Sequence, residues 1–203
     1  MSKQFQSHPW HGISPGEEAP GIVNAFIEIV PGDTVKYEID KASGWLKVDR
    51  PQKFSNIVPA LYGFIPQTYC GEEIAKFCAE KSGLEIKKGD GDPLDICVFS
   101  ERNITGGGIL LKAIPVGGLR LVDKNEADDK IIAVMQNDDV YSWNDISQFP
   151  PALIQRLRHY FLTYKNIPGD ANRVCEITHV YGREEALEVI RKSMTDYQRT
   201  FAS

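Results

Sequence analysis

The sequence has few of the features that mark several protein classes. Its four cysteines show no CxxC spacing, and a chain of 203 residues can fold without disulfides. Its apolar runs are far shorter than the roughly 20 residues of a membrane-spanning helix, and the first ten residues contain no apolar stretch typical of a secretion signal. We therefore expect a cytoplasmic protein with reduced thiols and no membrane association.

Positive charge is also scarce. The chain has 23 Lys and Arg residues against 28 Asp and Glu residues, a net charge of -5. This balance gives no general attraction to nucleic acid, so we expect no nucleic-acid partner. The triple glycine at residues 106–108 lacks the strand and helix context of a GxGxxG motif and the Lys-Ser/Thr of a P-loop, so it predicts no nucleotide-binding loop.

Short apolar runs rich in β-branched residues are abundant. They lie at residues 22–30, 34–39, 45–48, 94–99, 109–122 and 130–135, with turn-forming residues between several of them. Apolar residues make up 42% of the chain, which is enough for a core of ordinary size. The pattern predicts one domain over residues 1–203 whose first two thirds form a compact antiparallel or mixed barrel.

Helical patterns follow the strands. One begins at Pro150 and Pro151 and carries an apolar stripe to residue 164, and another repeats apolar residues from 187 to 201. Both helices are predicted to pack on the barrel, in an α+β, mainly β arrangement. The polar stretch from 69 to 89 could include a short helix lined by Ile74, Phe77 and Cys78.

The run DGDPLD places three carboxylates within six residues. Asp90 and Asp92 are two apart, so an extended backbone would direct both to one side, whereas Asp95 is out of phase. Gly91 permits a bend that could bring Asp95 to the same cavity. Carboxylates about 4 Å apart repel by roughly 4 kcal/mol at an effective dielectric near 20, so the cluster needs cations. Oxygen ligands alone favour Mg²⁺.

Two other interpretations compete for DGDPLD. An EF-hand loop requires Gly at its sixth position and Glu at its twelfth, where this chain has Asp95 and Glu101. A solvated turn is the ordinary role of an isolated Asp-Gly. An internal polar site is favoured because further charges two residues apart lie in or beside predicted strands: Lys36 with Glu38, and Asp128 with Lys130.

These strings together resemble the family I soluble inorganic pyrophosphatases. The matches are IEI at 27–29, KYEID at 36–40, SGWLKVDR ending at Arg50, LYGFIP around Tyr62, DGDPLDI, the run 123–130, and HYFLTYK ending at Lys165. They span about residues 22 to 165, in the family's order. The resemblance implies an OB-like five-stranded β-barrel with peripheral helices, and Mg²⁺-dependent hydrolysis of inorganic pyrophosphate to two orthophosphates.

The resemblance also implies roles for individual residues. Asp92 corresponds to the general base that acts on a water bridged by metal ions, with no covalent intermediate. Asp90, Asp95 and Asp128 correspond to metal ligands, and Asp95 to the bridge between two ions. The residues implied for further Mg²⁺ ions are Glu28, Glu38 and Asp123, and those implied for the phosphates are Lys36, Arg50, Tyr62, Lys130, Tyr164 and Lys165.

Two other functions are compatible with parts of the sequence. A phosphate- or nucleic-acid-binding OB-like barrel without catalysis has the same outline, although its carboxylates would repel a polyanion in the absence of metal. A nucleotide pyrophosphohydrolase would need a base-stacking or ribose-binding motif, and none is apparent.

His159 matches one of two interface histidines of hexameric relatives, while Thr163 stands at the other position. We expect a homo-oligomer, a hexamer first and a dimer second. His8 and His11, in HPWH, receive no role.

Overall fold

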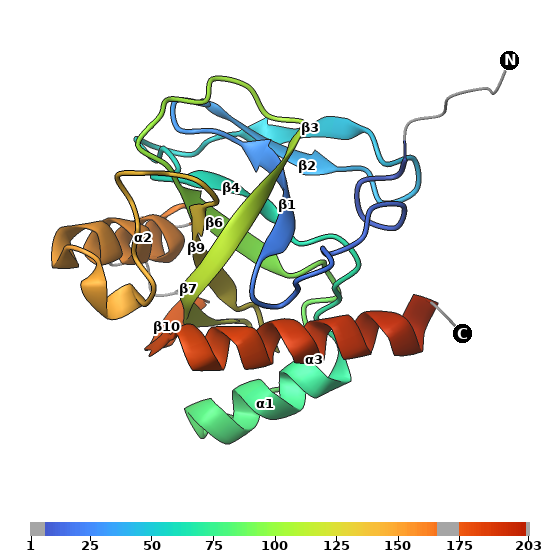
Figure 1. Ribbon diagram of the computed structural model, residues 1–203. Helices are drawn as coiled ribbons and strands as arrows, with labels where there is room; N and C mark the ends of the chain where they lie inside the picture. Colours follow the sequence, from blue (N-terminus) through green and yellow to red (C-terminus); the bar gives the residue numbers. More distant parts are fainter. Residues whose placement is uncertain (1–6, 166–174, 202–203) are drawn as a thin grey trace, which may run out of the picture.

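The computed structural model describes residues 7–165 and 175–201, and a closed ring of five strands forms its centre (Figure 1). The order around the ring is β1–β4–β6–β9–β7, and pairing of β7 with β1 closes it. Among these five strands, β6 and β9 form the one parallel pair. The strands are β1 (Val23–Ile29), β4 (Leu61–Phe64), β6 (Asp95–Phe99), β7 (Ile109–Asp123) and β9 (Lys130–Met135). The predicted mainly β fold with an OB-like five-stranded barrel is confirmed.

Apolar side chains cover both faces of the ring strands. In β6, Ile96 and Val98 join one buried cluster, whereas Cys97 and Phe99 join another on the opposite face. Successive side chains of a strand point to opposite faces, so a strand that is buried on both faces reads as a continuous apolar run. This explains why β6, β7 and β9 were predictable from composition.

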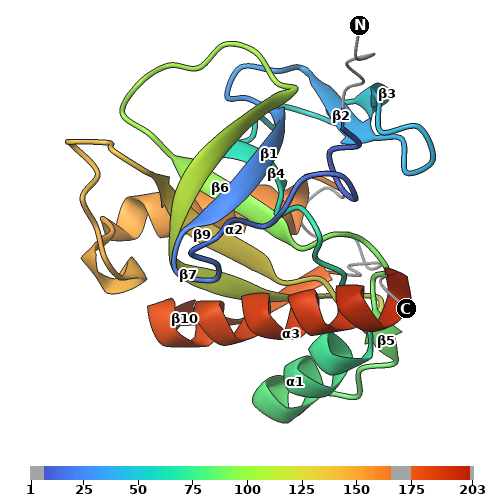
Figure 2. The same cartoon turned by 45° about the vertical axis from the view of Figure 1, so that its right-hand side comes forward.

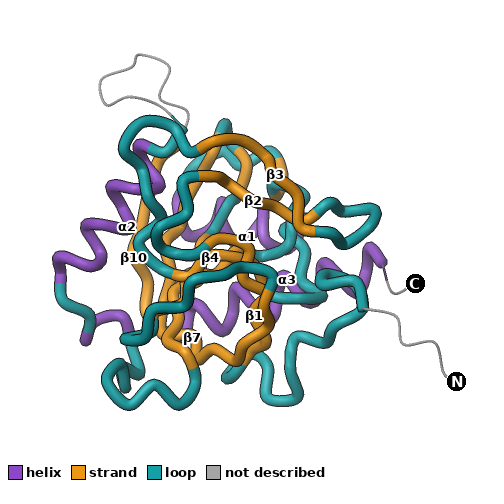
Figure 3. The backbone as a smooth tube through the Cα atoms, turned by 90° about the horizontal axis from the view of Figure 1, so that it is seen from above, coloured by secondary structure: helices purple, strands orange, loops and turns teal. Residues whose placement is uncertain are grey.

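Helices account for the burial on the outside of the ring. Helices α1 (Glu72–Ser82) and α3 (Arg183–Phe201) lie side by side against one end of it (Figure 2), and α2 (Pro151–Thr163) lies outside the strands elsewhere (Figure 3). The carboxylate of Asp196 on α3 accepts N–H groups of Gly71, Glu73 and Ile74 at 3.0–3.1 Å and so caps α1. Both predicted helices are present as α2 and α3, and the short helix considered within residues 69–89 forms as α1. No helix in the described ranges is long and apolar enough to cross a bilayer.

A hairpin of β2 (Val35–Ile39) and β3 (Leu46–Pro51) stands apart from the ring as a separate two-stranded sheet. Figure 1 shows it above the open end of the ring, away from α1 and α3. The remaining elements are the short strands β5 (Lys88–Gly89) and β8 (Glu126–Ala127), the strand β10 (Cys175–Gly182) paired with β7, and the 3₁₀ turn η1 (Ile146–Gln148). The hairpin and the ring leave a space between them that holds the site.

Strand β4 was not predicted, although it is one of the five ring strands. It has four residues and includes Gly63, whose missing side chain weakens any strand pattern. The structure needs that glycine, because a Cβ at residue 63 would lie 1.8 Å from the carbonyl oxygen of Phe26. Because β1 and β4 approach closely, residue 63 has to be glycine, and this glycine weakens the strand pattern in the sequence.

Candidate active site

One cavity of about 640 Å³ lies between the β2–β3 hairpin, the ring and the end of α2. It contains every residue for which a role was inferred from the sequence. Its lining includes the acidic residues Glu28, Glu38, Asp90, Asp92, Asp95, Asp123 and Asp128, and also Lys36, Arg50, Tyr62, Lys130, Tyr164 and Lys165. Segments up to 137 residues apart in the sequence thus contribute to a single site.

Glu28 enters the cavity from an irregularity in β1. The pairing of β1 with β4 shifts register between Ile27 and Ile29, and such bulges redirect a side chain. The Glu28 carboxylate is buried and accepts the Ile39 N–H at 2.6 Å. Burial first, and the nearby Asp95 second, raise the pKa of Glu28 to about 8. This carboxyl therefore keeps its proton to near-neutral pH.

The DGDPLD run turns sharply instead of running extended. Gly91 has φ +78°, and the Asp92 N–H donates to the Asp90 carboxylate at 3.0 Å. The extended arrangement considered for Asp90 and Asp92 is therefore wrong, and the bend permitted by Gly91 is the one that forms. Asp92 is directed to Lys41, whereas Asp95 begins β6 and faces the ring end of the cavity. The bend therefore places the Asp92 and Asp95 carboxylates in different parts of the cavity.

Lys130 forms the centre of the buried part of the site. Its ammonium contacts the carboxylates of Asp95 and Asp128, and the Tyr62 hydroxyl donates to Asp95 at 2.6 Å. Asp95 and Lys130 are partners in the parallel β6–β9 pairing, which fixes their meeting. Burial raises the pKa of Asp128 and, together with Asp128, that of Asp90. Burial opposes the charge of Lys130, but Asp128 and Asp95 leave its pKa raised.

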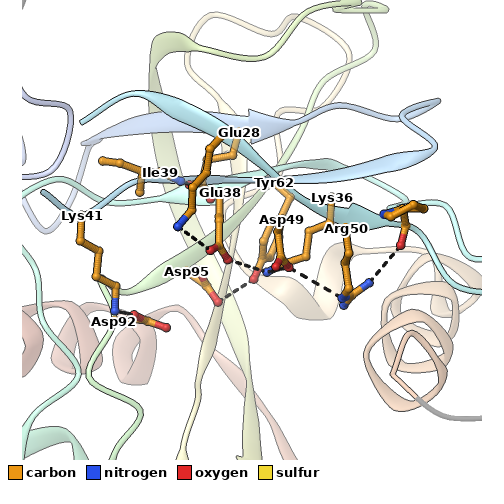
Figure 4. A network of polar contacts seen from close by, with 12 residues as sticks. Glu28, Lys36, Glu38, Ile39, Lys41, Asp49, Arg50, Tyr62, Asp92 and Asp95 are labelled. Atoms are coloured by element: carbon orange, nitrogen blue, oxygen red, sulfur yellow. Dashed lines mark hydrogen bonds and ion pairs between the residues drawn. The ribbon is translucent and has the colours of Figure 1, made fainter. Parts of the chain in front are cut away.

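The hairpin supplies a second group of charges (Figure 4). The Lys36 ammonium lies 3.1 Å from Glu38 and 2.9 Å from Asp49. The predicted same-face arrangement of Lys36 and Glu38 is therefore confirmed. The Arg50 guanidinium lies 3.7 Å from Asp49 and 6.0 Å from the centre of the Tyr164 ring. Arg50 thus faces the end of α2 across the cavity.

The end of α2 brings the remaining predicted residues. Lys165 pairs with Asp123 at the end of β7, and its ammonium stands 5.2 Å from the Tyr164 ring centre. The Tyr164 hydroxyl has its pKa raised, primarily by burial. The second carboxylate oxygen of Asp123 is buried without a hydrogen-bond partner in the described part of the chain. That oxygen is free to accept a cation.

The donor set fits a hard divalent cation. The cavity lining has nine carboxylates but six Lys and Arg side chains, and neither His nor Cys belongs to it. Oxygen donors with excess negative charge suit Mg²⁺. Across residues 7–165 and 175–201, no three His, Cys, Asp or Glu side chains already stand in a ligand arrangement. Pairs of carboxylates suffice for Mg²⁺, because this ion keeps several of its waters.

Sequence reasoning missed several charged residues of the cavity. Lys41, in the lining, pairs with Asp92, and Asp49, just outside the lining, pairs with Lys36. Asp49 was hard to find because β2 and β3 shift register between Lys36 and Tyr37, so simple cross-strand pairing does not predict its partner. Lys41 lies beyond the end of β2, where strand alternation gives no information. Asp40, Lys47 and Glu126 also line the cavity.

Several known proteins are similar to this chain in sequence and in fold. A family model described as inorganic pyrophosphatase matches residues 25–198. An inorganic pyrophosphatase of Chlamydia trachomatis serovar L2 is 50% identical over 200 residues, 96% of each chain. A soluble inorganic pyrophosphatase of Oryza sativa subsp. indica is 36% identical over 96% of this chain and 81% of its own. The crystal structure of inorganic pyrophosphatase from Thermus thermophilus matches with TM-score 0.77 and 29% identity, over 95% of this chain and 99% of that one.

Proposed function

Because this chain belongs to the inorganic pyrophosphatase family and is an inorganic diphosphatase, we propose that it hydrolyses pyrophosphate with Mg²⁺ and with Asp92 as the general base. One observation carries the proposal. Six cationic side chains and nine carboxylates line the same cavity of about 640 Å³. A polyanionic substrate requires the cationic side chains, and the metal ions that accompany it require the carboxylates.

Cationic and hydroxyl groups of the chain bind the two phosphates. Arg50 can hold one phosphate through two parallel N–H bonds, while Lys36 and Lys165 act as compact charges. Lys130 contacts the carboxylates of Asp95 and Asp128, and Tyr62 contacts that of Asp95. Together with Tyr164, which also lines the cavity, they orient the phosphate that is attacked. Positioning and neutralisation of charge are the main requirements of phosphoryl transfer, and these side chains provide both.

The carboxylates divide into ligands and base. Asp90, Asp95 and Asp128 would hold the first ions, and Asp95 would be shared between two of them. Glu28, Glu38 and Asp123 would hold the others. When bound, Mg²⁺ ions neutralise phosphate charge and lower the pKa of a coordinated water.

Asp92 lies outside the buried carboxylate group and remains available as a base. Its carboxylate is about half exposed in the cavity. Asp92 accepts a proton from the attacking water, whose oxygen bonds to one phosphorus while the bridging P–O bond breaks and the second phosphate leaves. This direct displacement needs no covalent intermediate.

Phosphate release under a Mg²⁺ titration tests the substrate and the metal. We expect turnover of pyrophosphate that is abolished by excess EDTA and restored by Mg²⁺, and slower turnover of ATP. Asp95→Asn should require a higher Mg²⁺ concentration, whereas Asp139→Asn, at an exposed position outside the cavity lining, should match the wild type. Equal rates on pyrophosphate and ATP, or turnover unaffected by EDTA, would contradict the proposal.

The setting of the enzyme belongs to the same proposal. We infer a cytoplasmic homo-oligomer, a hexamer before a dimer, that acts on a small molecule and has no nucleic-acid or membrane partner. The net charge of -5 and the four buried free cysteines support this setting. Light scattering should give about six times the 22.8 kDa of one chain, and a mass of one chain would contradict it.

A further inference from the structure

The Lys41 side chain makes a defined set of contacts beside Asp92. Its ammonium pairs with the Asp92 carboxylate (Figure 4). The same ammonium lies 3.4 Å from the carbonyl oxygen of Gly91 and 6.0 Å from the centre of the Trp10 ring. Within the described part of the chain, Lys41 provides the one ion pair or hydrogen bond to the Asp92 carboxylate. The orientation of Asp92 therefore depends on where Lys41 is held.

The HPWH motif at residues 8–11 holds the backbone of Lys41. The His8 Nε2 lies 3.2 Å from the Lys41 carbonyl oxygen, and its Nδ1 accepts the N–H groups of Trp10 at 3.2 Å and His11 at 3.3 Å. A carbonyl can only accept, so Nε2 carries the proton and Nδ1 is the acceptor. This neutral tautomer satisfies all three contacts at once.

The turn after Lys41 is shaped to receive His8. Gly44 has φ +74°, and a Cβ at this position would lie 2.8 Å from the His8 ring. The Asp40 carboxylate accepts the N–H groups of Ala42 and Ser43 at 3.2 Å and keeps the turn compact. The His8 ring thus rests on a turn that has no side chain at the point of contact.

Trp10 joins the motif to the loop that supports DGDPLD. Its indole N–H donates to the Thr68 carbonyl at 2.8 Å, and the Thr68 hydroxyl accepts the Leu94 N–H at 2.9 Å. Trp10 is 3% exposed and Thr68 is fully buried, so both contacts are shielded from water. One short segment therefore fixes the backbone on both sides of the Lys41–Asp92 pair.

We propose that Lys41 is a positioning residue for Asp92, and that residues 8–11 act as a clamp that holds Lys41 in place. The inference rests on the proposed role of Asp92. An ion pair this exposed adds little to folding stability, because water screens it. Its value is geometric, since misplacement of a reacting group by about 1 Å can cost roughly 100-fold in rate.

A double-mutant cycle between His8 and Lys41 tests the clamp. Lys41→Met should lower kcat about tenfold with little change in KM, because it frees Asp92 without touching the phosphates. Lys41→Arg should restore most of that loss. His8→Asn keeps an acceptor near the Nδ1 position and loses the contact with the Lys41 carbonyl. It should lower kcat roughly threefold in the wild type and have no further effect with Lys41→Met.

Matched variants separate the clamp from general damage. His8→Ala, which also removes the contact with the Lys41 carbonyl, is the second variant if His8→Asn fails to fold. His179→Asn, at an exposed histidine outside the cavity lining, should leave kcat unchanged. The thermal midpoint of each variant is measured beside its kinetics. Additive effects of His8→Asn and Lys41→Met, an unchanged kcat in Lys41→Met, or a rise in KM as its main effect would overturn the inference.

An Asp92→Asn arm distinguishes failure of the clamp from failure of the base assignment. If Asp92→Asn loses activity while Lys41→Met does not, the clamp is wrong and the base stands. If Asp92→Asn keeps the full kcat, the base assignment is wrong, and the clamp fails with it.

Discussion

At the residue scale, the contact between Tyr62 and Asp95 illustrates how the site is ordered. The Tyr62 hydroxyl and the Lys130 ammonium both contact the Oδ2 atom of Asp95, so two groups fix one carboxylate. Hydrogen bonds to charged groups contribute about 1.5–3 kcal/mol. Tyr62 and Asp95 lie on the adjacent ring strands β4 and β6. Tyr62 is paired with Cys97, and Asp95, two residues before Cys97, points to the same face of β6 and so comes within reach of Tyr62.

Tyr62→Phe should therefore lower kcat/KM by about tenfold or more, the rate equivalent of a hydrogen bond to a charged group. The ring remains, so its packing against Phe161 is kept. Steady-state phosphate release measures the effect, with Tyr141→Phe as the control, because Tyr141 stacks on Trp143 outside the cavity lining. An unchanged kcat/KM in Tyr62→Phe would show that this hydroxyl does not contribute to turnover.

The protonation of Glu28 gives a prediction about pH. In the unfolded chain its pKa is near 4.5, and in the folded protein burial raises it to about 8. Between these values the folded state binds the extra proton, so the free energy of unfolding falls as pH rises, by up to about 1.4 kcal/mol per pH unit. Glu28→Gln removes this dependence in the metal-free protein.

Urea unfolding in EDTA at several pH values from about 5 to 8 checks the sign. The free energy of unfolding of the wild type should decline with pH more steeply than that of Glu28→Gln. Parallel curves for the two proteins would show that Glu28 is not held protonated by its surroundings.

At the scale of elements, a buried ion pair links β7 to the start of β9, and its arginine also contacts α3. Arg120 on β7 and Asp129 before β9 are 1% and 2% exposed, and they lie 3.2 Å apart. Glu185 on α3 accepts from Arg120 at 2.8 Å, and the Tyr181 hydroxyl donates to Asp129 at 3.0 Å. Removal of one partner from such a pair leaves the other charge buried and uncompensated.

We expect Arg120→Met and Asp129→Leu each to lower the free energy of unfolding by about 3 kcal/mol, and the double variant to lose less than their sum. Denaturant unfolding measures all three. Arg191→Met breaks a half-exposed pair with Glu188 on α3 and should cost less than about 1 kcal/mol. If the two buried variants prove no more costly than Arg191→Met, the buried pair is not a strong source of stability.

The elements also show what a sequence can predict. Strands that are buried on both faces, such as β6 and β9, and helices with apolar stripes give strong local patterns. Strand β4 does not, because close packing on β1 demands Gly63. Charges two apart on one strand were predictable, as Lys36 and Glu38 confirm. The contact between Lys41 and Asp92 was not, because two turns from separate segments create it.

At the scale of the whole molecule, the net charge of -5 conceals an uneven distribution. Nine carboxylates line a single cavity, and the resemblance to a known family, more than local pattern, connected seven of them in the sequence. Their mutual repulsion opposes the folded state until cations bind. The stability of the whole chain should therefore depend on divalent metal.

Mg²⁺ should raise the thermal midpoint of the wild type, because an ion that binds only the folded state stabilises it by mass action. Asp90→Asn should weaken this rise by removing a proposed ligand, whereas Asp139→Asn should keep it. Thermal unfolding across a Mg²⁺ series, without substrate, measures binding independently of turnover. A midpoint insensitive to Mg²⁺ would contradict a resident metal site.

The most direct measurement is kcat for pyrophosphate in Asp92→Asn at saturating Mg²⁺, beside the wild type. The amide cannot accept the proton, so kcat should fall by at least about 100-fold, the usual contribution of a general base. The Mg²⁺-induced rise in the thermal midpoint should remain, because Asp92 is not assigned as a ligand. A kcat equal to that of the wild type would contradict the account.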